Sequence, residues 1–183
     1  DASLTSSYPG SSTTWFDITG NGHDLSLVNG PTFSSTDGGR IGFVGSSSQY
    51  GDFGAKSIIS NSFSFQMWIN ESLSVNGVGS VSSFSTTNSS PAASTWAMIT
   101  ITKDSSGNYE LYLDNTSIST GTSATNVGSG LTYQIGYATP RNPSYGTFYY
   151  LNADLGSFAL YTRELTSGEV TSNFNATKTR FGL

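Results

Sequence analysis

The sequence has no cysteine, a single histidine and few charged residues. Without cysteine, thiolate metal sites, thiol catalysis and a disulfide framework are excluded. The 183 residues include seven Lys and Arg and 12 Asp and Glu, which gives a net charge of −5. Seven scattered cations cannot form the phosphate-neutralising surface that non-specific nucleic-acid binding needs. No apolar run approaches the ~20 residues of a membrane helix, so we expect neither a nucleic-acid partner nor membrane insertion.

Small polar residues and aromatic residues dominate what is there. Ser, Thr, Gly and Asn make up half of the chain, and aromatic residues add 13%. The polar half alone would favour disorder. However, 3 Trp, 10 Tyr and 11 Phe recur along the whole length and can bury a large apolar area. Polar turns between aromatic and β-branched runs are typical of short strands.

Alternation predicts the strands. In residues 62–69, Phe63, Phe65, Met67 and Ile69 share one face and Trp68 lies on the other. Residues 95–102 alternate in the same way, with Trp96 and Met98 opposite Ile99 and Ile101. The spacing of about ten residues favours an antiparallel sandwich over βαβ units. Further strands are expected at 25–29, 40–44, 49–53, 78–84, 109–114, 117–119, 131–136, 147–152 and 154–161.

One helix is predicted, near residues 166–175. Thr166 can cap its start, and Glu169 lies at the third helical position, which is the pattern of a capping box. Leu165 and Val170 flank this pair at the spacing of a hydrophobic staple. The segment is too short for more than a few turns.

Several segments in order resemble laminin-G-like, concanavalin A-like jelly-roll domains. These are residues 1–3, 7–11, 14–22, 27–33, 38–45, 49–50, 62–68, 95–104 and 111–115, and a closing stretch made of residues 160–166, 169–170 and 173–183. The two ends resemble such domains in structural proteins of tailed bacteriophages, in fibres and decoration proteins. The resemblance implies an all-β, two-sheet antiparallel sandwich, with residues 1–183 as a single domain cut from a longer chain. It also implies a place on the virion surface, extracellular when mature.

The same resemblance bears on cofactors. Related lectin-like domains hold a structural calcium with acidic residues, whereas this chain has Gly156-Ser157 where the family often has an acidic pair. Val44 likewise replaces an expected Asp. We therefore expect no cofactor. The remaining calcium candidates are Asp17, Asn21 and Asp24, which form an oxygen-rich loop; the alternative is that these side chains only stabilise turns.

Catalysis is not expected, although glucanases share the sandwich. A retaining glycosidase needs two carboxylates about 5–5.5 Å apart. The only strand pair at suitable spacing is Glu110 and Asp114, and a turn begins at Asp114. The single histidine, His23, lies in a Gly- and Asn-rich turn. A glycoside hydrolase therefore remains a distant alternative.

The densest aromatic cluster lies between residues 133 and 150, around a loop with two prolines. Stacking rings and groups that bond hydroxyls in pairs are what sugar recognition needs. Tyr149, or Phe148 with Tyr150, can alternatively fill the core. We predict a non-enzymatic, lectin-like module that binds glycans. The candidate glycan-binding residues are Tyr137, Arg141, Asn142, Tyr145 and Tyr149.

The alternative function is a purely structural fibre or decoration domain that contacts other virion proteins. A neutral, hydroxyl-rich exterior suits packing against identical copies, as in a homotrimeric fibre. Exposed strand edges could also be extended by neighbouring chains. The sequence leaves this choice open.

Overall fold

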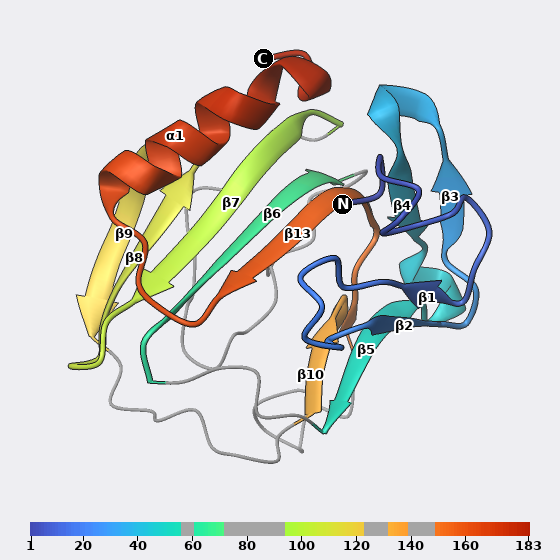
Figure 1. The fold of residues 1–183 in the computed structure, drawn as a ribbon, viewed down its shortest axis with the longest axis horizontal. Coiled ribbons are helices and arrows are strands. Elements are labelled where there is room, and N and C mark those ends of the chain that lie inside the picture. The colour runs from blue at the N-terminus through green and yellow to red at the C-terminus, as the bar shows by residue number, and fades with distance from the viewer. Residues whose placement is uncertain (56–60, 72–93, 123–131, 139–148) are drawn as a thin grey trace.

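The computed structural model describes residues 1–55, 61–71, 94–122, 132–138 and 149–183. In these residues the chain forms two antiparallel sheets and one α-helix (Figure 1). The smaller sheet has the order β1-β2-β5-β10, and the larger has the order β3-β4-β13-β6-β7-β8-β9. A separate two-stranded ribbon joins β11 and β12. The expected two-sheet, mostly β sandwich is therefore confirmed.

The strands follow the alternating segments of the sequence closely. Their bounds are β1 (Thr14–Trp15), β2 (Leu25–Val28), β3 (Thr32–Ser34), β4 (Arg40–Phe43), β5 (Tyr50–Ala55), β6 (Phe63–Glu71), β7 (Trp96–Lys103), β8 (Asn108–Leu113), β9 (Thr116–Thr122), β10 (Thr132–Ile135), β11 (Tyr137–Ala138), β12 (Tyr149–Tyr150) and β13 (Ala153–Tyr161). The sequence analysis missed β1, β3 and β11, which are two or three residues long. The strand expected at 78–84 lies outside the described residues, as does the start of the one expected at 147–152.

The main core fills the space between the two sheets. It buries side chains from both inner faces, among them Leu27 of β2, Ile41 of β4 and Ile69 of β6. Ile99 and Ile101 of β7 join it from the same face of the larger sheet. The predicted division of β6 and β7 into two faces is thus confirmed, because alternate residues of a strand point to opposite sides.

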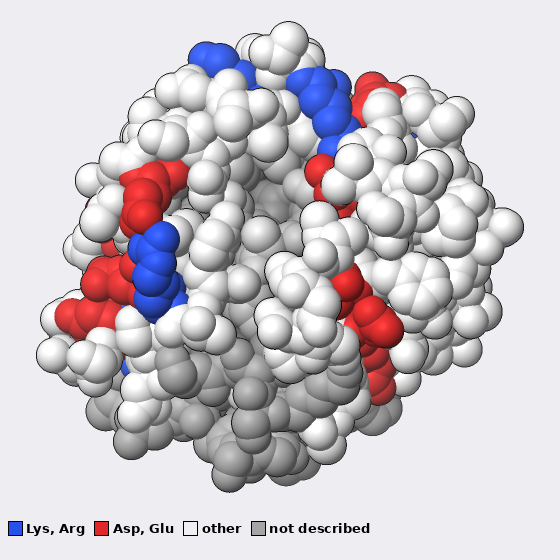
Figure 2. Space-filling view, in the orientation of Figure 1, with Lys and Arg blue, Asp and Glu red and all other residues white. Residues whose placement is uncertain are grey.

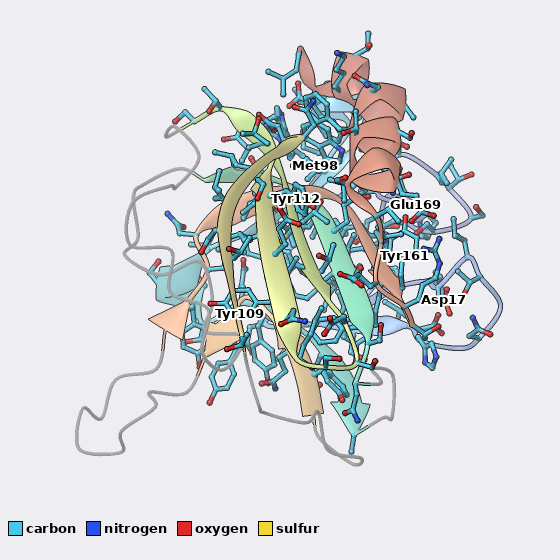
Figure 3. All side chains as sticks on the ribbon, turned by 90° about the vertical axis from the view of Figure 1, so that its left-hand side faces the viewer. Asp17, Met98, Tyr109, Tyr112, Tyr161 and Glu169 are labelled. Atoms are coloured by element: carbon cyan, nitrogen blue, oxygen red, sulfur yellow. The ribbon has the colours of Figure 1, made fainter. Side chains whose placement is uncertain are left out.

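A second core lies on the other face of the larger sheet. Helix α1 (Ser167–Thr177) and a final 3₁₀ turn (Lys178–Phe181) cover this face. Trp68 stacks on Phe181 with ring centroids 4.3 Å apart and on Phe174 at 5.8 Å. Figure 3 shows Met98 and Tyr112 in the strands beside the helix, and both are buried in this cluster. All eight residues of β7 are consequently buried.

The predicted helix start is confirmed in detail. The Thr166 hydroxyl accepts a hydrogen bond from the Glu169 N–H, and the Glu169 carboxylate accepts one from the Thr166 N–H, which makes a capping box. Leu165 and Val170 are both buried, as a staple requires. Arg163 adds a two-pronged contact to Glu169, with N···O distances of 2.9 and 2.6 Å. Among the described residues, no helix is long and apolar enough to cross a membrane.

The C-terminal turn is also fastened to the start of the chain. Arg180 donates to the Asp1 carboxylate at 2.7 Å and to the backbone oxygens of Asp37, Gly39 and Gly156. These bonds hold Phe181 against the sheet. The second core is therefore closed by contacts between the two ends of the described chain.

Candidate functional site

Two of the five predicted glycan-binding residues lie on the two-stranded ribbon. Tyr137 belongs to β11 and Tyr149 to β12; Tyr137 pairs with Tyr150, and Ala138 with Tyr149. Arg141, Asn142 and Tyr145 lie outside the described residues. The site is accordingly built from the tyrosines that the structure places.

Three tyrosines meet at one end of the smaller sheet, and we call Tyr50, Tyr137 and Tyr150 the tyrosine cluster. The ring centroids of Tyr50 and Tyr137 are 5.3 Å apart, those of Tyr137 and Tyr150 are 5.3 Å apart, and those of Tyr50 and Tyr150 are 6.3 Å apart. All three side chains are partly exposed. The cluster therefore presents apolar rings and hydroxyl groups at the surface.

Sequence reasoning missed two members of this cluster. Tyr50 begins β5, far from the aromatic-rich stretch in the sequence, and only strand pairing brings it near Tyr137. From the sequence, Tyr150 is named only as a residue that can fill the core with Phe148, but it lies outside the inter-sheet core. The reason is that β12 pairs with β11 in a ribbon of its own, so alternation along it does not point into the sandwich.

A line of polar side chains crosses the outer face of the smaller sheet beside the tyrosine cluster. The pairing register aligns Thr14 with Ser26, Ser26 with Asp52, and Asp52 with Gln134. We call these four residues the polar row. Their chain neighbours Trp15, Leu25, Leu27, Phe53 and Ile135 are buried in the inter-sheet core. Because alternate residues point to opposite faces, the polar row faces outward.

The tyrosine cluster and the polar row share one surface. Tyr50 and Asp52 are two residues apart on β5, so their side chains lie on the same face. Val28 pairs with Tyr50 in the next row of the sheet and is partly exposed. The lower right of Figure 2, over the ends of β1, β2 and β5, shows acidic groups and no basic group among the residues drawn in colour. This surface is therefore polar to acidic, with aromatic rings at one end.

The oxygen-rich loop uses its side chains to hold turns. One Asp17 carboxylate oxygen accepts hydrogen bonds from the Thr19 N–H and hydroxyl, and the other accepts from the His23 N–H. Asp24 accepts from the Asp17 N–H at 2.8 Å, and the Asn21 amide donates to Thr19. Burial raises the pKa of Asp17, but these hydrogen bonds outweigh it and the pKa lies below its usual value. In the described ranges, no three His, Cys, Asp or Glu side chains gather as a metal site would require.

Glu110 and Asp114 also have structural roles. Glu110 accepts a hydrogen bond from the Tyr112 hydroxyl at 2.6 Å, and burial together with this bond raises the pKa of Tyr112. Asp114 adopts a left-handed backbone with φ of 57° in the turn between β8 and β9. Its carboxylate accepts from the Met98 N–H at 2.9 Å. Glu110 thus holds the Tyr112 side chain, and Asp114 holds the turn between β8 and β9 against β7.

The glycine at position 156 has a packing explanation. A Cβ added to Gly156 would lie 2.5 Å from the Phe181 ring. The Gly156 carbonyl accepts hydrogen bonds from the Ala2 N–H and from Arg180. The C-terminal turn therefore occupies the space that a side chain at position 156 would need.

This sandwich has counterparts among known proteins. Residues 2–171 match the Laminin_G_3 family, described as the concanavalin A-like lectin/glucanases superfamily. The chain belongs to this superfamily. No curated protein sequence matches it. The match ends before the last helical turn and the 3₁₀ turn, which supply Phe174, Arg180 and Phe181 to the second core.

Several solved structures share the fold of this chain. The binding domain of Paraclostridial Mosquitocidal Protein 1 superposes with a TM-score of 0.66 at 17% identity, over 91% of this chain and 50% of that one. The Botulinum neurotoxin serotype G binding domain gives 0.60 at 15% identity, over 87% and 48%. Domain 4 of AbnA, an extracellular arabinanase from Geobacillus stearothermophilus solved with arabinotriose, gives 0.59 at 16% identity, over 85% and 90%. The chain thus spans about half of the toxin binding domains and nearly all of the arabinanase domain.

Proposed function

We propose that this laminin-G-like domain is a non-enzymatic carbohydrate-binding module and that it binds glycans at the tyrosine cluster. The observation that carries the proposal is the meeting of three partly exposed tyrosine rings from β5, β11 and β12 at one end of the smaller sheet. A pyranose ring has apolar C–H faces that stack on aromatic rings, while its hydroxyls need hydrogen-bond partners. Tyrosine offers both in one side chain.

The solved relatives support a binding role. Two of the three are binding domains by name, and the third is a domain of a carbohydrate-acting enzyme solved with a trisaccharide. The predicted residues Arg141, Asn142 and Tyr145 lie in the same loop region of the sequence as β11 and β12, and we keep them in the proposed site.

The setting that we propose is the surface of a tailed phage particle, because the two ends of the sequence resemble phage fibre and decoration domains. The competing role there is a structural domain that contacts neighbouring virion proteins, including copies of itself in a homotrimer. The surface that favours this role is rich in hydroxyl groups and poor in charge, with only 10% charged residues.

A glycan array followed by titration calorimetry tests the proposed function. Tyr50→Ala, Tyr137→Ala and Tyr150→Ala should each weaken glycan binding by at least tenfold, whereas Tyr50→Phe, which keeps the ring, should weaken it less. Tyr109→Ala is the matched control, because Tyr109 lies on β8, which belongs to the larger sheet. A domain that binds no glycan on the array, or whose binding survives all three alanine variants, would overturn the proposal.

A further inference from the structure

We infer that the ligand is a linear, neutral oligosaccharide that lies across the strands of the smaller sheet, along the polar row, with one end on the tyrosine cluster. This inference rests on the proposed function and adds the shape and the charge of the ligand. It starts from the register of the sheet, which places one polar side chain of each strand at the same level: Thr14, Ser26, Asp52 and Gln134.

The length of the polar row suits a chain of sugars better than one ring. Neighbouring strands lie about 4.8 Å apart, so a row across four strands spans about 14 Å. A single pyranose ring stacked on the tyrosine cluster would leave most of this row unused. A short unbranched oligosaccharide is long enough to reach from the cluster along the row.

The chemistry of the row matches sugar hydroxyls. Ser26 and Thr14 each carry a hydroxyl that donates and accepts, and Gln134 carries both a donor and an acceptor. One oxygen of Asp52 accepts from the Gly54 N–H at 2.7 Å, and its carboxylate has a second oxygen. Carboxylates and amides can bind two adjacent hydroxyls at once, which fixes the orientation of a ring.

The shape of the row is equally suitable. Ser26, Asp52 and Gln134 have short or unbranched polar side chains. Ser26 is exposed, and the other three members of the row are partly exposed. The strands beneath them are held by the inter-sheet core. The donors and acceptors are thus presented on a rigid strip, which lowers the entropic cost of binding an extended ligand.

The charge of the surface selects against acidic sugars. Asp52 is the only ionisable residue of the row, and a carboxylate so placed repels uronic or sialic acid groups at neutral pH. The neighbouring loop adds Asp17 and Asp24. Neutral sugars lose nothing to this repulsion and gain the hydrogen bonds, so binding should depend little on salt concentration.

Titration calorimetry with sugars of graded length tests the inference on the whole domain. The probes are arabino-oligosaccharides and cello-oligosaccharides of two to six residues, with oligogalacturonides of equal length as acidic counterparts. The affinity of the wild type should rise at least tenfold from the disaccharide to the tetrasaccharide and then level off. The acidic series should bind at least tenfold more weakly than neutral sugars of the same length.

The variants separate the row from the cluster. Asp52→Asn keeps an acceptor for the Gly54 N–H. Gln134→Ala removes a partly exposed side chain and Ser26→Ala an exposed hydroxyl, so all three variants should fold. Each should reduce the gain with length by threefold or more and should weaken binding of the tetrasaccharide more than binding of the disaccharide. Thr120→Ala, on β9 of the other sheet, is the matched control and should change nothing.

Each failure has its own signature. Binding that needs Tyr50 but does not strengthen with length, or that ignores the three row variants, overturns the extended ligand and leaves the proposed function standing. Equal or stronger binding of oligogalacturonides overturns the preference for neutral sugars. Absence of binding by every probe and on the glycan array overturns the proposed function, and the extended ligand falls with it.

Discussion

The outer face of the larger sheet is covered, whereas the outer face of the smaller sheet is open to solvent. On the larger sheet, Trp68, Trp96 and Phe181 are buried beneath α1 and the C-terminal turn. The smaller sheet leaves its tyrosines and its polar row at least partly exposed. Both indole N–H groups on the covered side are satisfied, by Thr177 at 2.9 Å and by Asp37 at 3.1 Å. The comparison indicates that the covered face stabilises the fold while the open face is available to a ligand.

The largest expected effect comes from emptying the covered face. Phe181→Ala removes a ring that contacts both Trp68 and Trp96, with centroids 4.3 and 4.7 Å away. Truncation of a buried Phe costs about 3–5 kcal/mol in the free energy of unfolding. Urea unfolding followed by tryptophan fluorescence measures the loss, because both neighbours are fluorescent.

Tyr50→Ala is the counterpart on the open face. This variant should lower the free energy of unfolding by less than about 1.5 kcal/mol, because the Tyr50 ring is partly exposed and its loss removes only the contacts within the tyrosine cluster. The comparison also predicts opposite effects on stability and on binding. Phe181→Ala should lower stability strongly without weakening glycan binding by the protein that remains folded. Tyr50→Ala should weaken glycan binding strongly and lower stability little. Equal losses of stability in the two variants would contradict the division between the faces.

The second effect concerns the glycine under the C-terminal turn. Gly156→Asp introduces an acidic side chain whose Cβ would lie 2.5 Å from the Phe181 ring. Overpacking of a core costs about 1–3 kcal/mol, and a carboxylate beside the ring adds to it. Gly168→Ala is the matched control, since the nearest atom to its added Cβ is the Thr166 Oγ1 at 3.9 Å, an ordinary van der Waals distance. This variant should raise the free energy of unfolding by about 0.5–1 kcal/mol, because glycine weakens a helix. Thermal unfolding of the two variants should therefore shift in opposite directions.

Much of this fold could be predicted, because alternation and capping are local signals. The inward residues of β6 and β7 and the capping box at Thr166 follow from neighbours in the sequence. The burial of the opposite strand face could not be read in this way. Thr100 and Thr102 are polar, yet they are fully buried, because segments some sixty residues later in the chain cover this face of the sheet. Alternation separates two faces of a strand but does not say that both are covered.

The candidate site was predictable only in part for the same reason. Tyr137 lies in a stretch whose aromatic density is visible in the sequence. Tyr50 is isolated there, and only the pairing of β5 with β10 brings it to Tyr137. The polar row has no local signal, since its members come from four separate strands. Such a site needs the register of the sheet, which short strands leave open.

The third effect is smaller and concerns the helix that covers the larger sheet. Thr166→Ala removes the hydroxyl that accepts from the Glu169 N–H. Loss of an N-cap costs about 1 kcal/mol, and Thr166→Ser should recover most of it. Urea unfolding of the three proteins gives the comparison. A loss above about 3 kcal/mol would mean that the cap holds the second core together and does more than end a helix.

The smallest effect is an acid dependence of stability at the start of the helix that covers the larger sheet. Hydrogen bonds from Arg163 and from the Thr166 backbone lower the pKa of Glu169 to about 2 from its usual 4.5. A group with a depressed pKa stabilises the fold above its unfolded value, and this contribution is lost as the pH falls from about 4.5 toward 2. The stability advantage of the wild type over Glu169→Gln should therefore be constant above pH 5 and shrink below it. Because Glu169 is exposed to solvent, the advantage should be small and should weaken in salt. A difference for Glu169→Gln that stays constant down to pH 2 would show that the hydrogen-bond geometry of the box, and not the charge, supports the helix over the second core.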